Sequence, residues 1–190
     1  MGKGFDWGSR GAGGQPTADL ASQSTLWRPK GLVAVLDAST LVAARLARVD
    51  RHSSSRDSVR LAGTVFDSFT SPAIVEEVEI VLARPKFGFT IVETRRWLDV
   101  FVRHSRQVDP GVVPGEYTAA LHGDVRDNPV LKTALAVNLH EEGQGAIAEA
   151  GTRYGCFIVS WDKHFEPGWN LWGWQCIRPD AFLALLHRIA

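Results

Sequence analysis

The sequence has few cysteines, no net charge and no long apolar run. Its 190 residues include two cysteines, and 21 basic residues balance 21 acidic ones. Cys156 and Cys176 have neither a metal-binding nor a redox spacing, which argues against a disulfide framework or a thiolate site. No apolar run approaches the roughly 20 residues that cross a bilayer, so we expect no membrane span. The balanced charge excludes a general attraction for nucleic acid, and any such contact must be local.

Basic residues gather in two stretches that could supply a local contact. They are Arg51, His52, Arg56 and Arg60 in the first, and Arg95, Arg96, Arg103, His104 and Arg106 in the second. Such runs usually form a solvated face, and binding to phosphate is the alternative.

The chain length fits one domain with a sizeable core. Residues 1–28 are rich in Gly, Ser and Gln and lack an apolar period, so we expect a flexible tail followed by a domain over 29–190. The low cysteine content and the lack of a signal-peptide pattern favour a reduced, cytoplasmic protein.

Hydrophobic patterns predict alternating strands and helices. Strands are expected near 32–36, 66–70, 156–160 and 174–177, and helices near 40–49, 72–82, 90–104, 128–139 and from 179 onward. A polar loop over 50–57 and a further helix after it are expected before the strand at 66–70. The alternation of Trp172, Trp174 and Cys176 indicates one face of an edge strand. Together these elements predict an α/β fold, a parallel sheet with helices on both faces.

Two of the predicted strands, 32–36 and 156–160, are apolar enough to be buried, and an acid follows each of them, Asp37 after the first and Asp162 after the second. Ligands of open parallel sheets bind outside the carboxyl ends of the strands, so these two acids are candidate site residues. For either acid alone a simple turn residue is the alternative, because an Asp side chain can bond its own backbone two residues on.

Two further acids stand where they could reach the same edge. Glu77 borders the apolar stripe of its helix, whereas Glu76 and Glu79 should point toward solvent. Asp127 precedes the helix at 128–139 and would cap it, with Asp124 as an auxiliary acid. An ordinary boundary glutamate and an ordinary cap are the alternatives.

Converging carboxylates are tolerable where a cation compensates their charge. Oxygen ligands without a partnering His or Cys select Mg²⁺ or Mn²⁺, and hydrolysis of a phosphodiester is the usual chemistry of such a site.

Several segments, in their order and spacing, resemble a known family. Asp37-Ala38-Ser39-Thr40 follows a strand, residues 71–86 read SPAIVEEVEIVLARPK, residues 124–135 read DVRDNPVLKTAL, and residues 158–164 read IVSWDKH. Together with residues 177–183 they resemble a PIN domain, of the kind found in VapC-like toxin ribonucleases of toxin-antitoxin pairs.

The resemblance implies a three-layer sandwich and an Mg²⁺-dependent or Mn²⁺-dependent ribonuclease, with Asp37, Glu77, Asp127 and Asp162 as the catalytic and metal-binding acids. Ser39 and Ser160 would help to order the site. An RNA substrate, an antitoxin protein and a homodimer are the implied partners.

The sequence departs from the family pattern in three places. Ser39 stands where Asn is common, an extra helical segment is expected at about 138–153, and Ser160-Trp161-Asp162 replaces a Thr-Gly-Asp-like turn. Trp161 could stack on a base, with packing as its alternative.

Three functions therefore compete. The first is an active endoribonuclease, and the second is a catalytically weak or inactive PIN-like module that binds RNA or a protein partner. The third, a phosphoacceptor or phosphatase domain, is disfavoured because the segment after Asp37 lacks a second Asp.

Overall fold

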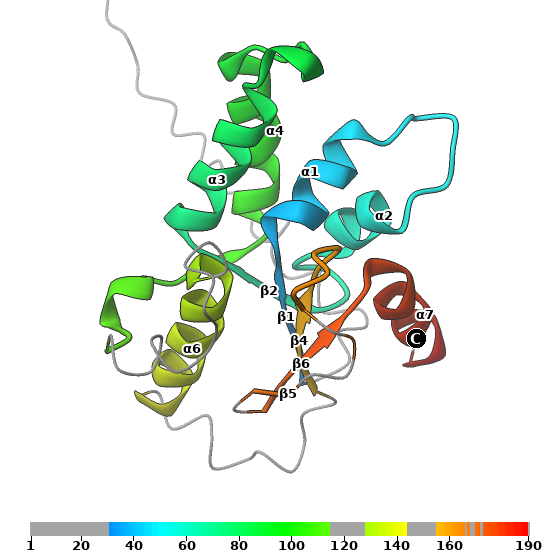
Figure 1. The fold of residues 1–190 in the computed structure, drawn as a ribbon. Helices are drawn as coiled ribbons and strands as arrows, with labels where there is room; N and C mark the ends of the chain where they lie inside the picture. Colours follow the sequence, from blue (N-terminus) through cyan, green and yellow to red (C-terminus); the bar gives the residue numbers. More distant parts are fainter. Residues whose placement is uncertain are drawn as a thin grey trace, which may run out of the picture.

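A computed structural model of the protein describes residues 31–114, 128–143, 155–165, 167, 170–171 and 173–189. These residues form an α/β fold in which one sheet lies between two layers of helices (Figure 1). The predicted fold class is therefore confirmed. Among the described residues, no helix is both long and apolar enough to cross a membrane. The tail predicted at residues 1–28 lies outside the described part of the chain.

The sheet has six strands in the order β3-β2-β1-β4-β6-β5. They are β1 (Leu32–Leu36), β2 (Asp67–Thr70), β3 (Arg106–Gln107), β4 (Gly155–Val159), β5 (Asn170–Leu171) and β6 (Trp174–Ile177). Every pair is parallel except β5 with β6, which is antiparallel. The continuous apolar run of β1 is buried along its whole length, as expected for a strand covered on both faces.

The expectation of an edge strand at 174–177 was wrong. β6 lies between β4 and β5, because the two-residue strand β5 forms the edge. The alternation was read correctly, since Trp174 and Cys176 are buried and Gln175 is exposed. The indole N–H of Trp174 donates to the side chain of Asn138 at 2.9 Å, so this Trp is a core residue with its polar atom satisfied. Trp172 lies outside the described residues.

Six α-helices are found in the described residues. They are α1 (Ala38–Leu46), α2 (Ser54–Leu61), α3 (Pro72–Leu82), α4 (Ile91–Arg103), α6 (Asn128–Gly143) and α7 (Pro179–Ile189), and the 3-10 turns η2 (Pro85–Phe87) and η3 (Pro110–Val112) accompany them. In Figure 1, α2 and α7 lie on one side of the sheet and α3 and α6 on the other. The predicted extra segment begins as a continuation of α6 to Gly143, and residues 144–153 lie outside the described part.

The helix starts follow capping chemistry. The Ser71 hydroxyl accepts a hydrogen bond from the backbone N–H of Ile74 at 3.4 Å, and Pro72 occupies the first helical position of α3. Thr90 and Glu93 form a reciprocal capping box at the start of α4. Both helix starts agree with the sequence prediction.

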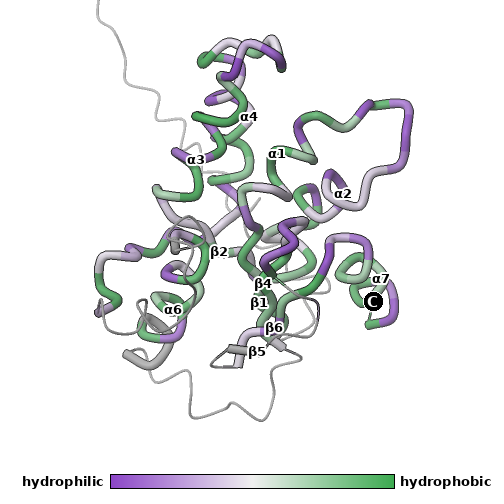
Figure 2. Tube along the Cα trace, viewed as in Figure 1, coloured by the Kyte–Doolittle hydropathy of each residue, from purple (hydrophilic) through white to green (hydrophobic). Residues whose placement is uncertain are grey.

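The apolar residues concentrate in the central strands, while the loop between α1 and α2 is hydrophilic (Figure 2). On the α7 side, the ring of Phe182 meets Phe66 edge to face, with centroids 5.0 Å apart, and lies 5.8 Å from Phe157. Phe182 and Phe66 are fully buried. This aromatic contact fixes α7 against the sheet.

Replacing Phe182 with Ala should therefore cost about 3–5 kcal/mol of unfolding free energy, because a large buried ring leaves a cavity that the neighbours cannot fill. Denaturant unfolding measures the loss. Phe87→Ala, which truncates a half-buried ring in η2, is the control and should cost much less. Equal losses for the two variants would contradict this account of the core.

Candidate active site

Three neighbouring parallel strands end at the same level of the sheet. Leu36 of β1 pairs with Val159 of β4, and Val159 pairs with Ile177 of β6. The register continues for one more residue, since the Asp37 N–H donates to the Val159 carbonyl at 3.1 Å and the Ser160 N–H donates to that of Ile177 at 3.1 Å. The carboxyl edge of the sheet therefore places Asp37 beside Ser160.

Asp37 is a buried carboxylate, with 8% of its surface exposed. It caps α1, and its Oδ2 accepts hydrogen bonds from the Ser39 backbone N–H at 3.3 Å, the Ser39 hydroxyl at 2.5 Å and the Ser160 hydroxyl at 2.7 Å. Burial raises the pKa of Asp37, and the hydrogen bonds from Ser39 and Ser160 oppose that shift without cancelling it. Asp37 thus makes the local turn contact that was its alternative role and caps α1, and it also lies in the site.

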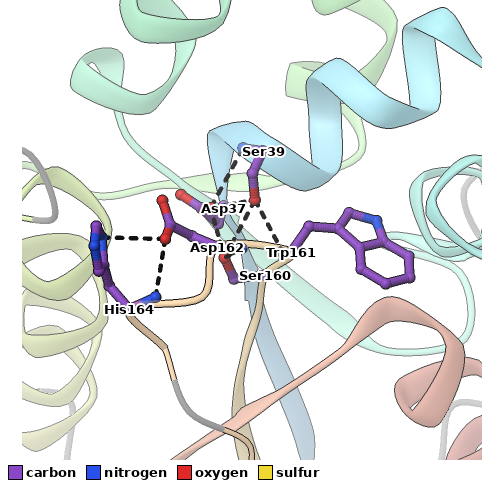
Figure 3. Close-up of polar contacts among 6 residues, drawn as sticks. All are labelled: Asp37, Ser39, Ser160, Trp161, Asp162 and His164. Atoms are coloured by element: carbon purple, nitrogen blue, oxygen red, sulfur yellow. Dashed lines mark hydrogen bonds and ion pairs between the residues drawn. The ribbon is translucent and has the colours of Figure 1, made fainter.

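The two serines connect Asp37 to the turn after β4. Each hydroxyl has one proton, and each donates it to Asp37 Oδ2. The same oxygens accept from the next two backbone N–H groups, Ser39 Oγ from Trp161 at 3.0 Å and Ser160 Oγ from Asp162 at 2.9 Å. The position of Asp162 is thereby tied to that of Asp37 (Figure 3).

Asp162 is half-buried, and its side chain bonds to the backbone that follows it. Its Oδ1 accepts from the His164 backbone N–H at 2.9 Å and lies 3.2 Å from His164 Nδ1 (Figure 3). The first bond is the two-residue turn expected of an Asp after a strand. As with Asp37, the turn geometry and a place at the site coexist.

Glu77 reaches the same place from α3. A cavity of about 330 Å³ is lined by Asp37, Ala38, Ser39, Val42, Glu77, Val81, Arg84, Val130 and Asp162. Three predicted acids, from the ends of two strands and the face of one helix, thus share one cavity. Glu76 is exposed, as predicted.

The prediction that Glu79 points toward solvent was wrong. Its two carboxylate oxygens accept from the Arg95 guanidinium at 3.0 and 3.2 Å, which joins α3 to α4. Glu79 is therefore only partly exposed, and this pairing also occupies Arg95, one of the basic residues considered for phosphate binding.

Sequence reasoning missed Arg84, an exposed cation that lines the acidic cavity. A signal for it was available, because Glu77, Val81 and Arg84 follow one another at helical spacing and all three line the cavity. A buried hydroxyl contact of 2.7 Å between Thr133 and Ser71 joins α6 to the start of α3. Val130, one turn before Thr133, is thereby held at the cavity wall.

The donor set of the cavity consists of oxygen atoms. Within the described residues no Lys, Arg or His forms an ion pair with Asp37, although its carboxylate is buried. Burial and the charge of Asp37 raise the pKa of Cys176 to about 12, so that thiol stays neutral and offers no soft ligand. The residues thus fit a hard cation such as Mg²⁺ or Mn²⁺.

Across the described ranges, no three His, Cys, Asp or Glu side chains stand close enough to hold an ion among themselves. Mg²⁺ commonly takes only one or two carboxylates and completes its shell with waters and substrate phosphate, so the donor set still fits that ion. Asp124 and Asp127 lie outside the described residues, and their part in the site stays a prediction.

Comparison with known proteins gives little more. No family model matches the sequence, and no curated protein matches it. Among solved structures the chain is similar to the PIN domain of RRP44 from T. brucei, with 14% identity, 90% of this chain and 92% of that chain covered, and a TM-score of 0.45. A likeness at this level does not define an activity, so the function must come from the site itself.

The burial of Asp37 predicts how stability depends on pH. Its folded-state pKa lies above the ordinary value of an aspartate, 3.8, so the folded protein binds more protons than the unfolded chain between those two pKa values. Stability contributed by the protonated carboxyl is present below this interval and is lost as the pH rises through it.

In EDTA, Asp37→Asn should therefore gain melting temperature relative to the wild type as the pH rises from acid to neutral, by about 2–4 °C for each kcal/mol of burial cost removed. Asn keeps one oxygen for the two serine hydroxyls. Melting curves at several pH values test this, with Glu76→Gln as the exposed control. A melting-temperature difference that does not change with pH would contradict the raised pKa.

Proposed function

We propose that the protein is a divalent-metal-dependent endoribonuclease whose metal ligands are Asp37, Glu77, Asp127 and Asp162. The observation that carries this proposal is the shared cavity, whose lining includes three of these acids although one follows β1, one lies on α3 and one lies in the turn after β4. The buried Asp37 carboxylate has no ion-pair partner among the described residues, and placing it in one cavity with two further acids costs free energy, which a bound cation offsets.

Bound Mg²⁺ or Mn²⁺ would polarise the phosphoryl oxygen and lower the pKa of a water that attacks phosphorus. The residues of the chain have separate tasks. Ser39 and Ser160 hold the Asp37 carboxylate in one orientation and fix the turn that carries Asp162. Arg84, on the rim of the same cavity, supplies a guanidinium that can pair with the phosphate of the substrate.

The choice of RNA rests on the resemblance of the four sequence segments to PIN-domain toxins, because a carboxylate cavity by itself serves phosphodiesters in general. The same resemblance supports a role as the toxin of a toxin-antitoxin pair, with an antitoxin protein as inhibitor and a homodimer as the working form. Size-exclusion chromatography with light scattering tests the dimer, and DNA of matched sequence tests the preference for RNA.

A module that binds RNA or a protein partner with weak or no catalysis is the second candidate. One observation favours it: the described side chains do not by themselves complete a three-ligand group. The cleavage assay described next decides between the two candidates.

We expect purified protein to cleave labelled RNA when Mg²⁺ or Mn²⁺ is added and not in EDTA. Glu77→Gln and Asp37→Asn should each lose more activity than the roughly 10- to 100-fold typical of residues that only orient a ligand, a range expected for Ser39→Ala and Ser160→Ala. Glu76→Gln, one residue away on the same helix but exposed, is the matched control and should cleave normally. Equal cleavage by the Glu77 and Glu76 variants would remove Glu77 from the site, and no cleavage by the wild type with either metal would favour the binding module.

Asp127 needs its own test, because it was assigned chiefly from the resemblance. If it is a ligand, Asp127→Asn should lose cleavage and also require more Mn²⁺ for the activity that remains, since losing a ligand weakens metal binding. If it only caps α6, the variant should keep both its stability and its metal dependence, because Asn caps a helix about as well as Asp does. Metal titrations of cleavage, together with melting curves, separate the two results.

A further inference from the structure

A second cavity lies on the other side of the turn that carries Asp162. Its volume is about 660 Å³, and it is an open cavity lined by the end of α1, the loop to α2, the start of α2 and the start of α7. Its lining includes Leu46, Arg48, Arg51, His52, Trp161 and Leu183. A volume of this size lies within the range of small-ligand sites. The lining combines apolar surface, an aromatic ring and basic side chains with one carboxylate, that of Asp180.

Trp161 forms the wall next to the acidic cavity, and its ring is both fixed and open. The indole N–H donates to Ser55 Oγ at 2.6 Å, and the backbone N–H donates to Ser39 Oγ at 3.0 Å. The residue is nevertheless 38% exposed, whereas the core residue Trp174 is 1% exposed. Figure 3 shows the indole pointing away from Asp37 and Asp162. The ring is therefore held in place without being covered, unlike a packing residue.

The loop that faces Trp161 is held by its own polar contacts. The Arg56 guanidinium donates to the carbonyl oxygens of Arg48 at 2.6 Å and Arg51 at 2.5 Å, and Arg48 pairs with Asp50 through two bonds of 3.1 Å. His52 Nδ1 lies 3.0 Å from Asp57 Oδ2.

The side chain of Arg51 takes no part in these contacts. In the part of the chain that the structure describes, the Arg51 guanidinium has neither a hydrogen bond nor an ion pair, and it is exposed at the cavity. The Arg178 guanidinium lies over the Trp161 ring, 5.8 Å from its centroid. A partly exposed aromatic ring and an exposed guanidinium in the lining of one cavity match a flat π-system attached to an anionic group.

We propose that this cavity binds one unpaired nucleotide of single-stranded RNA, with its base stacked on Trp161 and its phosphate paired with Arg51. The inference rests on the proposed function and extends it to a substrate subsite. Trp161 stands between Ser160, which bonds Asp37, and Asp162, which lines the acidic cavity, so the bound nucleotide lies next to the phosphodiester at the acids. A base can reach the ring only when it is unpaired, so the subsite selects single strands over duplexes.

Binding of short labelled single-stranded RNA to the full-length protein in EDTA, measured by fluorescence anisotropy, tests this proposal apart from catalysis. Trp161→Ala should weaken binding between about 5-fold and about 100-fold, the range that corresponds to one stacked base. Trp161→Phe keeps a π-face and should bind nearly as well as the wild type. Melting curves establish that each variant is folded.

An RNA series with one abasic nucleotide at each position in turn gives the sharper readout. The wild type should lose affinity at one position, and Trp161→Ala should lose nothing further at that position, because the contact is already gone. A purely structural role of Trp161 would leave both proteins equally sensitive, and that result would overturn the proposal. Arg51→Ala should reduce the slope of log affinity against log salt by roughly 0.7, whereas Arg60→Ala, an exposed arginine outside the cavity lining, should not.

The failure of this proposal is distinguishable from the failure of the proposed function. Metal-dependent cleavage that needs Asp37, combined with unchanged RNA binding by Trp161→Ala, would overturn the subsite and keep the nuclease. Binding that depends on Trp161 without cleavage in any metal would keep the subsite and overturn the nuclease. The nucleotide proposal is also wrong if neither the wild type nor Trp161→Ala binds RNA while a partner protein binds in the wild-type cavity.

Discussion

The Asp37 carboxylate is largely buried at the end of the central strand, where little water can solvate its charge. A carboxylate in that position is tolerable only if other groups supply hydrogen bonds or positive charge. Ser39 and Ser160 supply the hydrogen bonds, and they arrive from two elements far apart in the sequence, the first turn of α1 and the end of β4. The rest of the site depends on this contact, because the same hydroxyls also accept the backbone N–H groups of the next turn.

The parallel register makes this contact possible. Leu36 pairs with Val159, so the residue after each strand meets its neighbour across the carboxyl edge, and the buried Thr40 hydroxyl strengthens the junction by donating to the Val159 carbonyl at 2.8 Å. A shift of one residue between β1 and β4 would exchange the faces on which the β1 side chains pack and would separate Asp37 from Ser160. The hydrophobic pattern that places β1 in the core therefore also places the acids.

This coupling explains which features the sequence could predict. Continuous apolar runs mark β1 and β4, and Ser71 with Pro72 marks the start of α3. The orientation of Glu77 follows from its place beside the apolar stripe of α3. The arrangement of these three elements was therefore predictable from local signals. The edge strands β3 and β5 were missed because each has only two residues, too few for any periodicity to be read. The course of the loop before α2 was missed for a different reason. It depends on Arg56 donating to two backbone carbonyls, a contact that no spacing rule reveals.

The three residues 160–162 show how one turn can serve two cavities. Ser160 faces inward to Asp37, Trp161 faces outward to Ser55 of α2, and Asp162 lines the acidic cavity, so successive side chains point to different sides of the same backbone. A Gly at the central position, as in the turn that the family pattern leads one to expect, would keep the hydrogen bonds of Ser160 and Asp162 and leave the larger cavity without an aromatic wall. The indole is thus an addition to the acidic site that does not disturb its geometry. Changes at residue 161 can therefore alter what is bound beside the acids while the acids stay in place.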